Sequence, residues 1–447
     1  VKTRGEYAVV EDPRRRPFEQ VERALLRHPG VEMVTPNEAL YPLALPNDPD
    51  LCLQWALFAL RLPEAWKVTQ GSASVVVAVI DSGINFAHSD LRDPKLWEDG
   101  WDFVDDTEYR FDPADEARAA HHGTHVAGII GRLTNNMIGG AGVAWSVRLM
   151  PVRVFTGKDP LETIPVDVVA EAVTWAVEHG ANVINLSLGC DPRACAPNPL
   201  LVRAIERARS EGVAVVAAAG NYQTGFGPVM FPANSPGVIA VGATDRQNGR
   251  AFYSAQGAEL DVVAPGGGGS TCSELIRAPA ADQNDVDACA AGTSLAAPHV
   301  SGIVALMLAA GSAHDAEEAE ILLTMATQDL SSPGWDPSTG WGLVDAYAAV
   351  SAGVPVVFAA AEDGSGRLIA AARPQRPGAG GFYQLRGIPE GRWKVVAWYD
   401  RDADQRLSAG DFYGEHPAEV NVRRGARLAR LDIVMTPYEG PGRDVVF

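Results

Sequence analysis

The chain has 447 residues, of which 47% are hydrophobic, and a formal net charge of −19. This length can bury one large core and still carry smaller modules. The strongly negative charge argues against a nucleic-acid partner and is typical of a soluble protein. The longest candidate for a membrane span, near Gly302 to Ala310, is too short to cross a bilayer and predicts a buried helix instead.

The first segment predicts a strand, a helix and a second strand. Gly5 to Glu11 has the strand pattern, Pro17 to Arg27 is amphipathic at helical spacing, and Val31 to Pro36 is again strand-like. Tyr41 to Pro46 follows as a proline-punctuated stretch of the kind that proteases cut. The chain begins at Val1 without a signal-peptide pattern, so we expect any export signal to have been removed or left out.

Strand ends and helix starts then carry residues suited to acyl transfer. An apolar strand at Ser74 to Ile80 leaves Asp81 at its carboxyl end, where open α/β sheets place their sites. His122 opens one apolar helical pattern, which runs to Leu133, and Ser294 opens another, which runs to Leu308. Apolar strands are also predicted at Asn182 to Leu186 and at Val213 to Ala219.

The chemistry explains these residue types. A serine hydroxyl is a weak nucleophile until a base removes its proton, and neutral His122 can do this for Ser294. A buried carboxylate at Asp81 would fix the imidazole tautomer and stabilise the imidazolium. The side-chain amide of Asn221 and the backbone N–H of Ser294 would then bind the oxyanion. The sequence therefore predicts an Asp81, His122, Ser294 triad with Asn221 as a fourth catalytic residue.

Four motifs, in one order, resemble the signatures of the subtilisin-like serine peptidases. The similarity covers roughly Pro46 to Val350. It implies a three-layer α/β fold with a mostly parallel central sheet in a peptidase domain at 44–352. The motifs are Asp81-Ser82-Gly83, His122-Gly123-Thr124-His125-Val126-Ala127-Gly128, Ala218-Ala219-Gly220-Asn221 and Gly292-Thr293-Ser294-Leu295-Ala296-Ala297-Pro298.

Residues 1–43 resemble the second half of the family's inhibitory propeptide, most closely at Pro29 to Asn37. The first half is missing. The resemblance implies a zymogen whose propeptide is an intramolecular inhibitor, with self-cleavage between Tyr41 and Pro46. The alternative is an ordinary N-terminal extension that is never cut.

Two segments are expected to bind substrate by the same resemblance. Ser187, Leu188 and Gly189 resemble the segment that pairs with an extended peptide through its backbone, which reads shape rather than sequence. Ala218, Ala219 and Gly220 would line the primary specificity pocket, and their small size predicts a roomy pocket with a broad, apolar preference. The alternative is that both segments are merely the ends of core strands.

Calcium is the expected cofactor. The resemblance gives one site with side-chain oxygens from Asp48, Asp90 and Asn136 and carbonyl oxygens from Leu133, Ile138 and Gly140, the ligands that a hard cation prefers. A second candidate is an acidic loop whose spacing fits a calcium loop, with Asp400, Asp402, Asp404, Arg406 and Asp411 as its ligands. Solvated loops without an ion are the alternative at both places.

Residues 353–447 form a separate C-terminal module, because helical periodicity stops there and short alternating strands begin. Its strands are predicted at Val356 to Ala361, Gly381 to Leu385, Trp393 to Tyr399 and Leu428 to Met435, which favours a small β-sandwich. Gly266 to Gly269 is the one low-complexity segment and predicts a flexible surface loop.

Five cysteines leave at least one unpaired. Loop context favours Cys190 with Cys195 and Cys272 with Cys289, leaving Cys52 free, although sequence alone also allows five reduced thiols.

The sequence as a whole predicts a secreted, monomeric serine endopeptidase that acts on proteins or peptides. Two other classes stay open. A metal-dependent hydrolase could hold zinc with His121, His122, His125 and Asp81, because helical spacing permits two ligands on one face. A catalytically silent binding protein could use the C-terminal module.

Overall fold

The computed structural model describes residues 2–4, 7–9, 25, 27, 45–159, 162–332, 334–351, 356–362, 368–370, 391–399, 406–407, 412–417, 419–422, 436–437 and 443–446. The chain divides into two compact units, Val1–Ala44 and Leu45–Phe447, and each is described by itself. In the first unit, β1 (Lys2–Arg4) and β2 (Tyr7–Val9) pair antiparallel, and the predicted helix and second strand lie outside the described residues except at Leu25 and Arg27.

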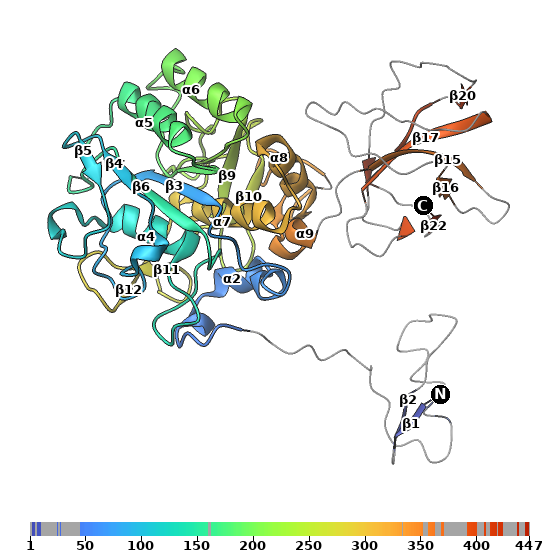
Figure 1. The fold of residues 1–447 in the computed structure, drawn as a ribbon, viewed down its shortest axis with the longest axis horizontal. Coiled ribbons are helices and arrows are strands. Elements are labelled where there is room, and N and C mark those ends of the chain that lie inside the picture. The colour runs from blue at the N-terminus through green and yellow to red at the C-terminus, as the bar shows by residue number, and fades with distance from the viewer. Residues whose placement is uncertain are drawn as a thin grey trace. The chain divides into compact units, whose positions relative to one another are not determined.

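Short apolar runs form the ten-stranded sheet at the centre of the second unit (Figure 1). The strand order is β13-β14-β10-β9-β8-β7-β3-β6-β4-β5. The strands from β14 to β4 run parallel, and an antiparallel pair closes each end. The predicted α/β class is confirmed. The strands are β3 (Val76–Asp81), β4 (Gly100–Asp102), β5 (Thr107–Tyr109), β6 (Arg148–Arg153), β7 (Val183–Leu186), β8 (Ala214–Ala218), β9 (Val238–Thr244), β10 (Val262–Pro265), β13 (Thr327–Gln328) and β14 (Leu343–Val344).

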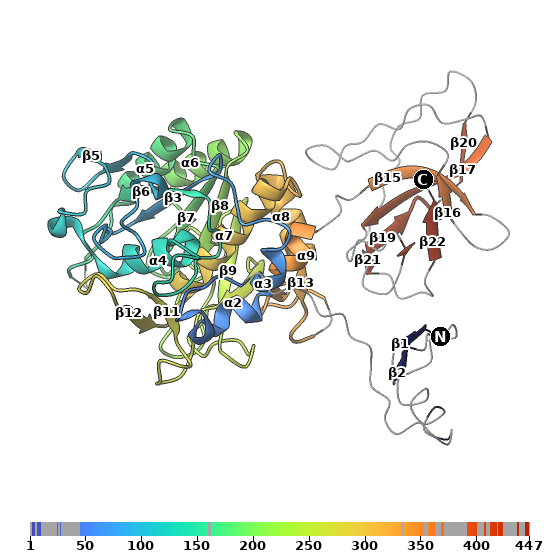
Figure 2. The same cartoon turned by 60° about the horizontal axis from the view of Figure 1, so that its bottom comes forward.

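Helices cover both faces of this sheet (Figures 1 and 2). α5 (Val166–Glu178) and α6 (Pro199–Ser210) pack together over one face, whereas α4 (His121–Gly131) and α7 (Thr293–Ala310) pack together over the other. These four helices contact β3, β7, β8 and β9. Because helices cover both faces of the sheet, all six residues of β3 are buried.

α7 is the central helix of the core. Among the described residues it is the one helix that is long and apolar enough to cross a membrane, and 78% of that stretch is buried inside the protein. The smaller helices are η1 (Leu51–Leu53), α2 (Trp55–Ala59), α3 (Leu62–Ala65), η2 (Pro94–Leu96), η3 (Glu116–Arg118), α8 (Ala316–Met325) and α9 (Ala346–Ser351).

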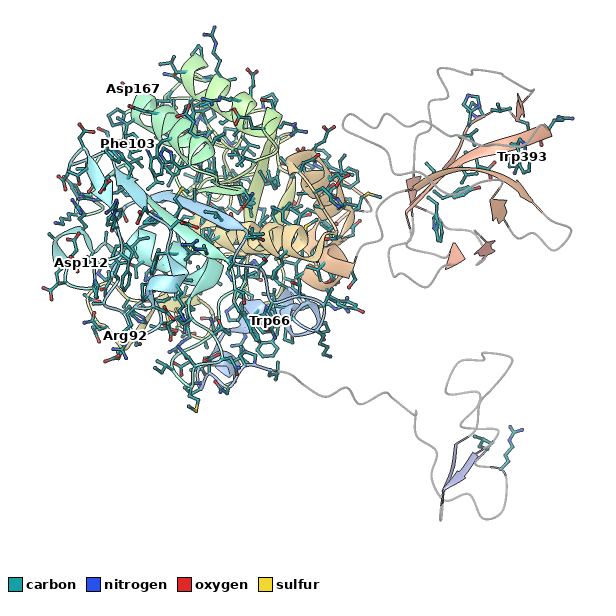
Figure 3. The ribbon with its side chains drawn as sticks, in the orientation of Figure 1. Trp66, Arg92, Phe103, Asp112, Asp167 and Trp393 are labelled. Carbon is teal, nitrogen blue, oxygen red and sulfur yellow. A yellow bond between two sulfur atoms is a disulfide. The ribbon has the colours of Figure 1, made fainter. Side chains whose placement is uncertain are left out.

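Side chains fill the space between these elements, as at the buried Trp66 (Figure 3). An aromatic cluster lies beside the loop that follows β3. Phe86 packs edge-on against Trp97 and Tyr109, with ring centroids 4.7 and 5.3 Å apart. The hydroxyl of Tyr109 accepts a hydrogen bond from the backbone N–H of Ile84 across 2.8 Å. The cluster therefore fixes the backbone three residues after Asp81.

After residue 351, the described strands form a second, mostly antiparallel sheet. Strand β15 (Val356–Glu362) pairs with β17 (Gly391–Tyr399), which confirms the first and third predicted strands of the module. The other two predicted strands lie outside the described residues, and the sandwich and the three-domain division stay predictions. The remaining strands are β16 (Leu368–Ala370), β18 (Arg406–Leu407), β19 (Phe412–Glu415), β20 (Val420–Val422), β21 (Thr436–Pro437) and β22 (Arg443–Val446).

Candidate active site

The end of β3 and the start of α4 bring Asp81 and His122 together. Asp81 is the last residue of β3 and has a fully buried side chain, whereas 35% of the His122 side chain is exposed. Nδ1 of His122 donates to Oδ1 of Asp81 across 2.8 Å. The carboxylate therefore fixes the tautomer that leaves Nε2 free to accept a proton, as a triad requires.

The surroundings of the two neighbouring histidines push their pKa values apart. Burial lowers the pKa of His122, but the charge of Asp81 and its hydrogen bond outweigh burial and raise this pKa above its ordinary value of 6.5. Burial and the charges of His122 and His121 lower the pKa of His125 to about 4. His125 is buried and neutral at pH 7, so it behaves as a packed helix residue. In the described part of the chain, no group of three or more His, Cys, Asp or Glu side chains is placed to hold a metal ion.

Glycines let the first two motifs approach each other closely. A Cβ at Gly123 would lie 2.7 Å from the carbonyl oxygen of Gly83 and 2.8 Å from that of Ser82. In the space left free, the backbone N–H of Gly123 donates to Oγ of Ser82 across 2.9 Å, which satisfies one of the unpaired donors at the start of α4. The sequence interpretation missed this role of Ser82, although its position directly after Asp81 is a usable signal.

Ser294 and Asn221 lie around one point in space. An ideal Cβ built on Gly292 would be 3.0 Å from Oγ of Ser294, 3.5 Å from Nδ2 of Asn221 and 3.8 Å from the backbone nitrogen of Ser294. A nucleophile and two hydrogen-bond donors thus converge beside Gly292. A carbonyl group that Oγ attacks there would place its developing negative charge near both donors. The helices that carry His122 and Ser294, α4 and α7, pack against each other.

Thr293 fixes the orientation of the Asn221 amide. Oδ1 of Asn221 accepts from the backbone N–H of Thr293 at 2.9 Å and from its hydroxyl at 3.1 Å. The same hydroxyl oxygen accepts from the backbone N–H of Gly220 at 3.0 Å. With Oδ1 held by two donors, Nδ2 is the end of the amide that remains for a ligand. The sequence interpretation did not assign Thr293, and its only signal is its place between Gly292 and Ser294.

The two predicted substrate segments lie side by side, because they follow neighbouring parallel strands. Ser187-Leu188-Gly189 continues from β7, and Ala218-Ala219-Gly220 ends β8 and extends past it. Gly220 has φ 113°, a conformation that favours glycine. Ser187 is buried, and its hydroxyl donates to the carbonyl of Ser294 across 2.8 Å. One predicted substrate segment is therefore bonded directly to Ser294, the predicted nucleophile.

The glycine run differs from its prediction. Gly266 and Gly267 are buried, so the expected flexible surface loop is wrong at these positions. The hydroxyl of Tyr253 lies within hydrogen-bond distance of the carbonyl oxygens of Gly266 and Gly267, at 2.8 and 2.7 Å. The backbone N–H of Gly292 also donates to the carbonyl oxygen of Gly266, at 3.0 Å. A Cβ on Gly266 would lie 2.8 Å from the carbonyl oxygen of Gly292. Glycine here allows close packing behind the nucleophile rather than flexibility.

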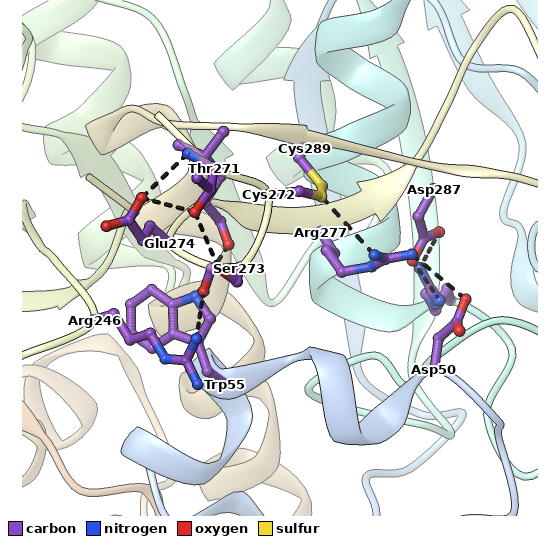
Figure 4. The surroundings of a disulfide bond; sticks show 12 residues. Asp50, Trp55, Arg246, Thr271, Cys272, Ser273, Glu274, Arg277, Asp287 and Cys289 are labelled. Atoms are coloured by element: carbon purple, nitrogen blue, oxygen red, sulfur yellow. Dashed lines mark hydrogen bonds and ion pairs between the residues drawn. A yellow bond between two sulfur atoms is a disulfide. The ribbon is translucent and has the colours of Figure 1, made fainter. Parts of the chain in front are cut away.

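Both predicted disulfides, Cys190–Cys195 and Cys272–Cys289, are present, and Cys52 is free and exposed. The second bond braces the segment before Ser294, where β11 (Ile276–Pro279) pairs with β12 (Asp287–Ala290) (Figure 4). Arg277 in this hairpin reaches Oδ2 of Asp50 at 3.7 Å, and Trp55 donates to the carbonyl of Leu275 at 3.0 Å. The bracing thus ties the hairpin to the first residues of the second unit.

The structure joins four residues of the first predicted calcium set, Asp48, Asp90, Leu133 and Asn136, through hydrogen bonds. Asp48 accepts from the backbone N–H groups of Asn135 and Asn136, and Nδ2 of Asn136 donates to Oδ1 of Asp90 at 3.0 Å. The N–H of Leu133 donates to the carbonyl of Asp90 at 2.8 Å, and the loop continues through Ile138 and Gly140. The oxygen ligands are of the type that calcium takes. Asn136 presents nitrogen to Asp90, so its amide would have to turn over to serve as a ligand.

A buried arginine shares this loop. Nε of Arg132 lies 3.1 Å from Oδ2 of Asp90, and its Nη1 and Nη2 donate to the carboxylate of Asp287 at 2.8 and 3.2 Å. The side chains of all three residues are at most 2% exposed. The charge of Asp90 is therefore already balanced in part by a guanidinium. Of the second predicted calcium set, Asp400, Asp402, Asp404 and Asp411 lie outside the described residues, and Arg406 is described only as part of β18.

Comparison with known proteins identifies the family of this chain. Residues 72–342, more than half of the chain, match a family model described as the subtilase family, Peptidase_S8. The thermophilic serine proteinase of Bacillus sp. (strain AK1) is 38% identical over 66% of this chain and 67% of its own length.

A second relative, an extracellular protease of Xanthomonas campestris pv. campestris, is 36% identical over 75% of this chain and only 62% of its own length. A solved protease structure from Pseudoalteromonas arctica PAMC 21717 has a TM-score of 0.59 at 34% identity, covering 69% of this chain and 99% of that one. The chain belongs to the subtilase family of serine peptidases.

Proposed function

We propose that this chain is a secreted serine endopeptidase that hydrolyses peptide bonds through Asp81, His122 and Ser294. The observation that carries the proposal is the convergence of Oγ of Ser294 and Nδ2 of Asn221 on one point beside Gly292. The 2.8 Å hydrogen bond from His122 to buried Asp81 also supports the proposal, because it fixes the tautomer of His122 that can act as the base. The word extracellular in the names of several relatives supports secretion.

In the first half of the reaction, Oγ of Ser294 attacks the scissile carbonyl carbon while Nε2 of His122 takes the hydroxyl proton. Nδ2 of Asn221 and the backbone N–H of Ser294 donate to the oxyanion of the tetrahedral intermediate. The C–N bond then breaks, and the imidazolium of His122 returns the proton to the leaving amine. The product is an ester of Ser294 with the acyl half of the substrate.

In the second half, water replaces the amine. His122 removes a proton from the water as its oxygen attacks the ester carbonyl, and the same two donors hold the second oxyanion. When the C–O bond to Ser294 breaks, His122 protonates Oγ and the enzyme is regenerated. The proton balance closes with one water consumed for each bond cut.

The triad is tested with a fluorophosphonate probe and the Ser294→Ala variant. The wild-type protein should be labelled at Ser294 and should cut casein, and the variant should do neither while keeping its circular dichroism spectrum. Proteolysis that survives in Ser294→Ala would sink the assignment. Labelling of Ser294 without proteolysis would instead point to an acyl-transfer enzyme with another substrate.

We further propose that residues 1–43 act as an intramolecular inhibitor that the enzyme removes itself. The intact mass of freshly purified wild-type protein should fall by the mass of a segment ending between Tyr41 and Pro46. Ser294→Ala should retain its full mass, and added wild-type enzyme should then trim it. An uncut chain in both preparations, with Ser294 still reactive toward the probe, would contradict self-processing.

Calcium binding by Asp48, Asp90, Asn136 and the carbonyls of Leu133, Ile138 and Gly140 is likewise a proposal, supported by the hydrogen bonds that join Asp48, Asp90, Asn136 and Leu133. Calcium would hold the loop and takes no part in the chemistry above. Substrate peptides are proposed to lie along Ser187 to Gly189, with an apolar side chain between that segment and Ala218 to Gly220. The enzyme is proposed to act as a monomer.

A further inference from the structure

We infer that Met230 sets the side-chain preference of the enzyme by filling the far end of the primary pocket. The substrates would then be polypeptides with a small residue, such as alanine, before the scissile bond, and large aromatic residues would be excluded there. This inference rests on the proposed function, because it assumes that the segments after β7 and β8 are the walls of that pocket.

The side chain of Met230 touches both walls. A Cβ on Gly220 would overlap Cγ of Met230 and would lie only 2.6 Å from its Sδ. On the other wall, a Cβ on Gly189 would lie 3.3 Å from Cβ of Met230 and 3.8 Å from its Sδ. The wall after β8, Ala218-Ala219-Gly220, is made of small residues, which alone would leave a roomy pocket. The thioether of Met230 occupies part of the space that these residues leave.

The backbone holds Met230 in this place. Its N–H donates to the carbonyl of Ala219 at 2.8 Å, which ties it to the wall that follows β8. The next residue, Phe231, exchanges two backbone hydrogen bonds with Cys190, at 2.7 and 3.0 Å, which ties it to the other wall. The disulfide from Cys190 to Cys195 anchors that second attachment. Met230 thus spans the gap between the two walls and cannot move out of it as a rigid body.

The chemistry of the side chain decides how strict the exclusion is. Methionine is unbranched and has three rotatable bonds, so it can shift to admit one or two additional methylene groups. An aromatic ring needs a flat slot that the thioether would have to leave completely. We therefore expect alanine to be accepted best, leucine to be tolerated, and phenylalanine and tyrosine to be rejected.

The test compares kcat/KM for matched peptide p-nitroanilides that end in alanine, leucine or phenylalanine. Met230→Ala should raise the ratio of kcat/KM for the phenylalanine substrate to that for the alanine substrate by about tenfold or more, because even one methylene in an apolar pocket is worth about tenfold. Met230→Leu keeps most of the volume and should leave the ratio within about twofold of wild type. The control Leu200→Ala removes an exposed apolar side chain on α6, 55% accessible, and should leave the ratio unchanged.

A ratio that stays within twofold in Met230→Ala, in protein that the fluorophosphonate labels fully, would overturn this inference and leave the triad standing. Absence of both labelling and hydrolysis in wild type would overturn the proposed function and this inference with it. If Met230→Ala does not fold, wild-type cut sites in a denatured protein decide the question. Small residues should then precede most cuts, and a majority of aromatic residues there would contradict the role of Met230.

Discussion

The hydroxyl of Ser187 donates to the carbonyl oxygen of Ser294 across 2.8 Å. In a regular helix that carbonyl would accept from the N–H four residues later. In α7 this position is Pro298, which has no N–H to donate. Because of this proline, the carbonyl of Ser294 has no helical donor four residues later. The hydroxyl of Ser187, directly after β7, donates to it instead.

We predict that Ser187→Ala lowers kcat by up to about tenfold, because losing one hydrogen bond of about 1 kcal/mol lets the first turn of α7 shift. The thermal midpoint should change little, and Ser187→Thr should restore most of the rate. Ser210→Ala is the matched control, since its hydroxyl also donates to a helical carbonyl, at 2.8 Å, but at the exposed last residue of α6. An unchanged kcat in Ser187→Ala would show that the bond does not position the nucleophile.

The pH profile should report the pair of Asp81 and His122. Only neutral His122 can act as the base, so activity rises with pH through its pKa. Because Asp81 raises that pKa, the midpoint of the acid limb of kcat/KM should lie above pH 6.5. The raised pKa also makes stability depend on pH. Protonated His122 beside Asp81 stabilises the folded state fully below pH 6.5, and this contribution is lost as pH rises through the pKa of His122 in the folded protein.

Asp81→Asn should move that limb to lower pH. The substitution removes the charge that raises the pKa of His122 and leaves burial, which lowers it. The maximal rate should fall about ten-thousandfold, the size of drop known for this change in an unrelated triad. If the midpoint of the acid limb of kcat/KM did not change in Asp81→Asn, a group other than His122 would control it.

Asn221→Ala should lower kcat and leave KM nearly unchanged, because Nδ2 meets charge that exists only in the transition state. The expected loss is about a hundred- to thousandfold, a value taken from a subtilisin rather than derived from this chain. Thr293→Val keeps the shape but removes the hydroxyl that holds Oδ1 of Asn221 at 3.1 Å, so it should show a smaller loss of the same kind. A change in KM alone would contradict the oxyanion role.

Arg132→Met should make the protein depend on calcium. Removing the guanidinium leaves the buried carboxylates of Asp90 and Asp287 without their ion-pair partner, which should lower the free energy of unfolding by about 3–5 kcal/mol. A calcium ion beside Asp90 would offset part of this cost. Thermal midpoints in calcium and in EGTA should therefore differ more in the variant than in wild type. Arg61→Met is the control, because the side chain of Arg61 is 48% exposed in its pair with Asp345, and an ion pair at the surface is worth about 1 kcal/mol or less.

Much of this arrangement could be predicted from sequence, because the catalytic residues stand where apolar runs end. The runs before Asp81 and Asn221 are short and continuously apolar, which favours central strands of a parallel sheet, and the structure shows both strands fully buried. Element boundaries moved by one or two residues; β3, for example, begins at Val76 and includes Asp81. The disulfides were predictable because each joins cysteines close in sequence.

What the sequence could not give depends on contacts between distant segments. Gly266 and Gly267 have the composition of a flexible loop, and only the position of Tyr253 turns them into a buried support. Met230 sits ten residues after Gly220, in a stretch with no periodicity, and only the fold brings it against Gly189 as well. Arg132 follows the helical pattern of α4, and its partner Asp287 is 155 residues away.

The central position of α7 has a practical consequence. The same helix that fills the middle of the core also presents the nucleophile at its first turn. A molecule whose core is not assembled cannot hold Ser294 against Asn221, so it cannot react with a mechanism-based reagent. In processed enzyme, stoichiometric labelling of Ser294 therefore counts native molecules, and the loss of that label with time or heat measures unfolding of the core itself.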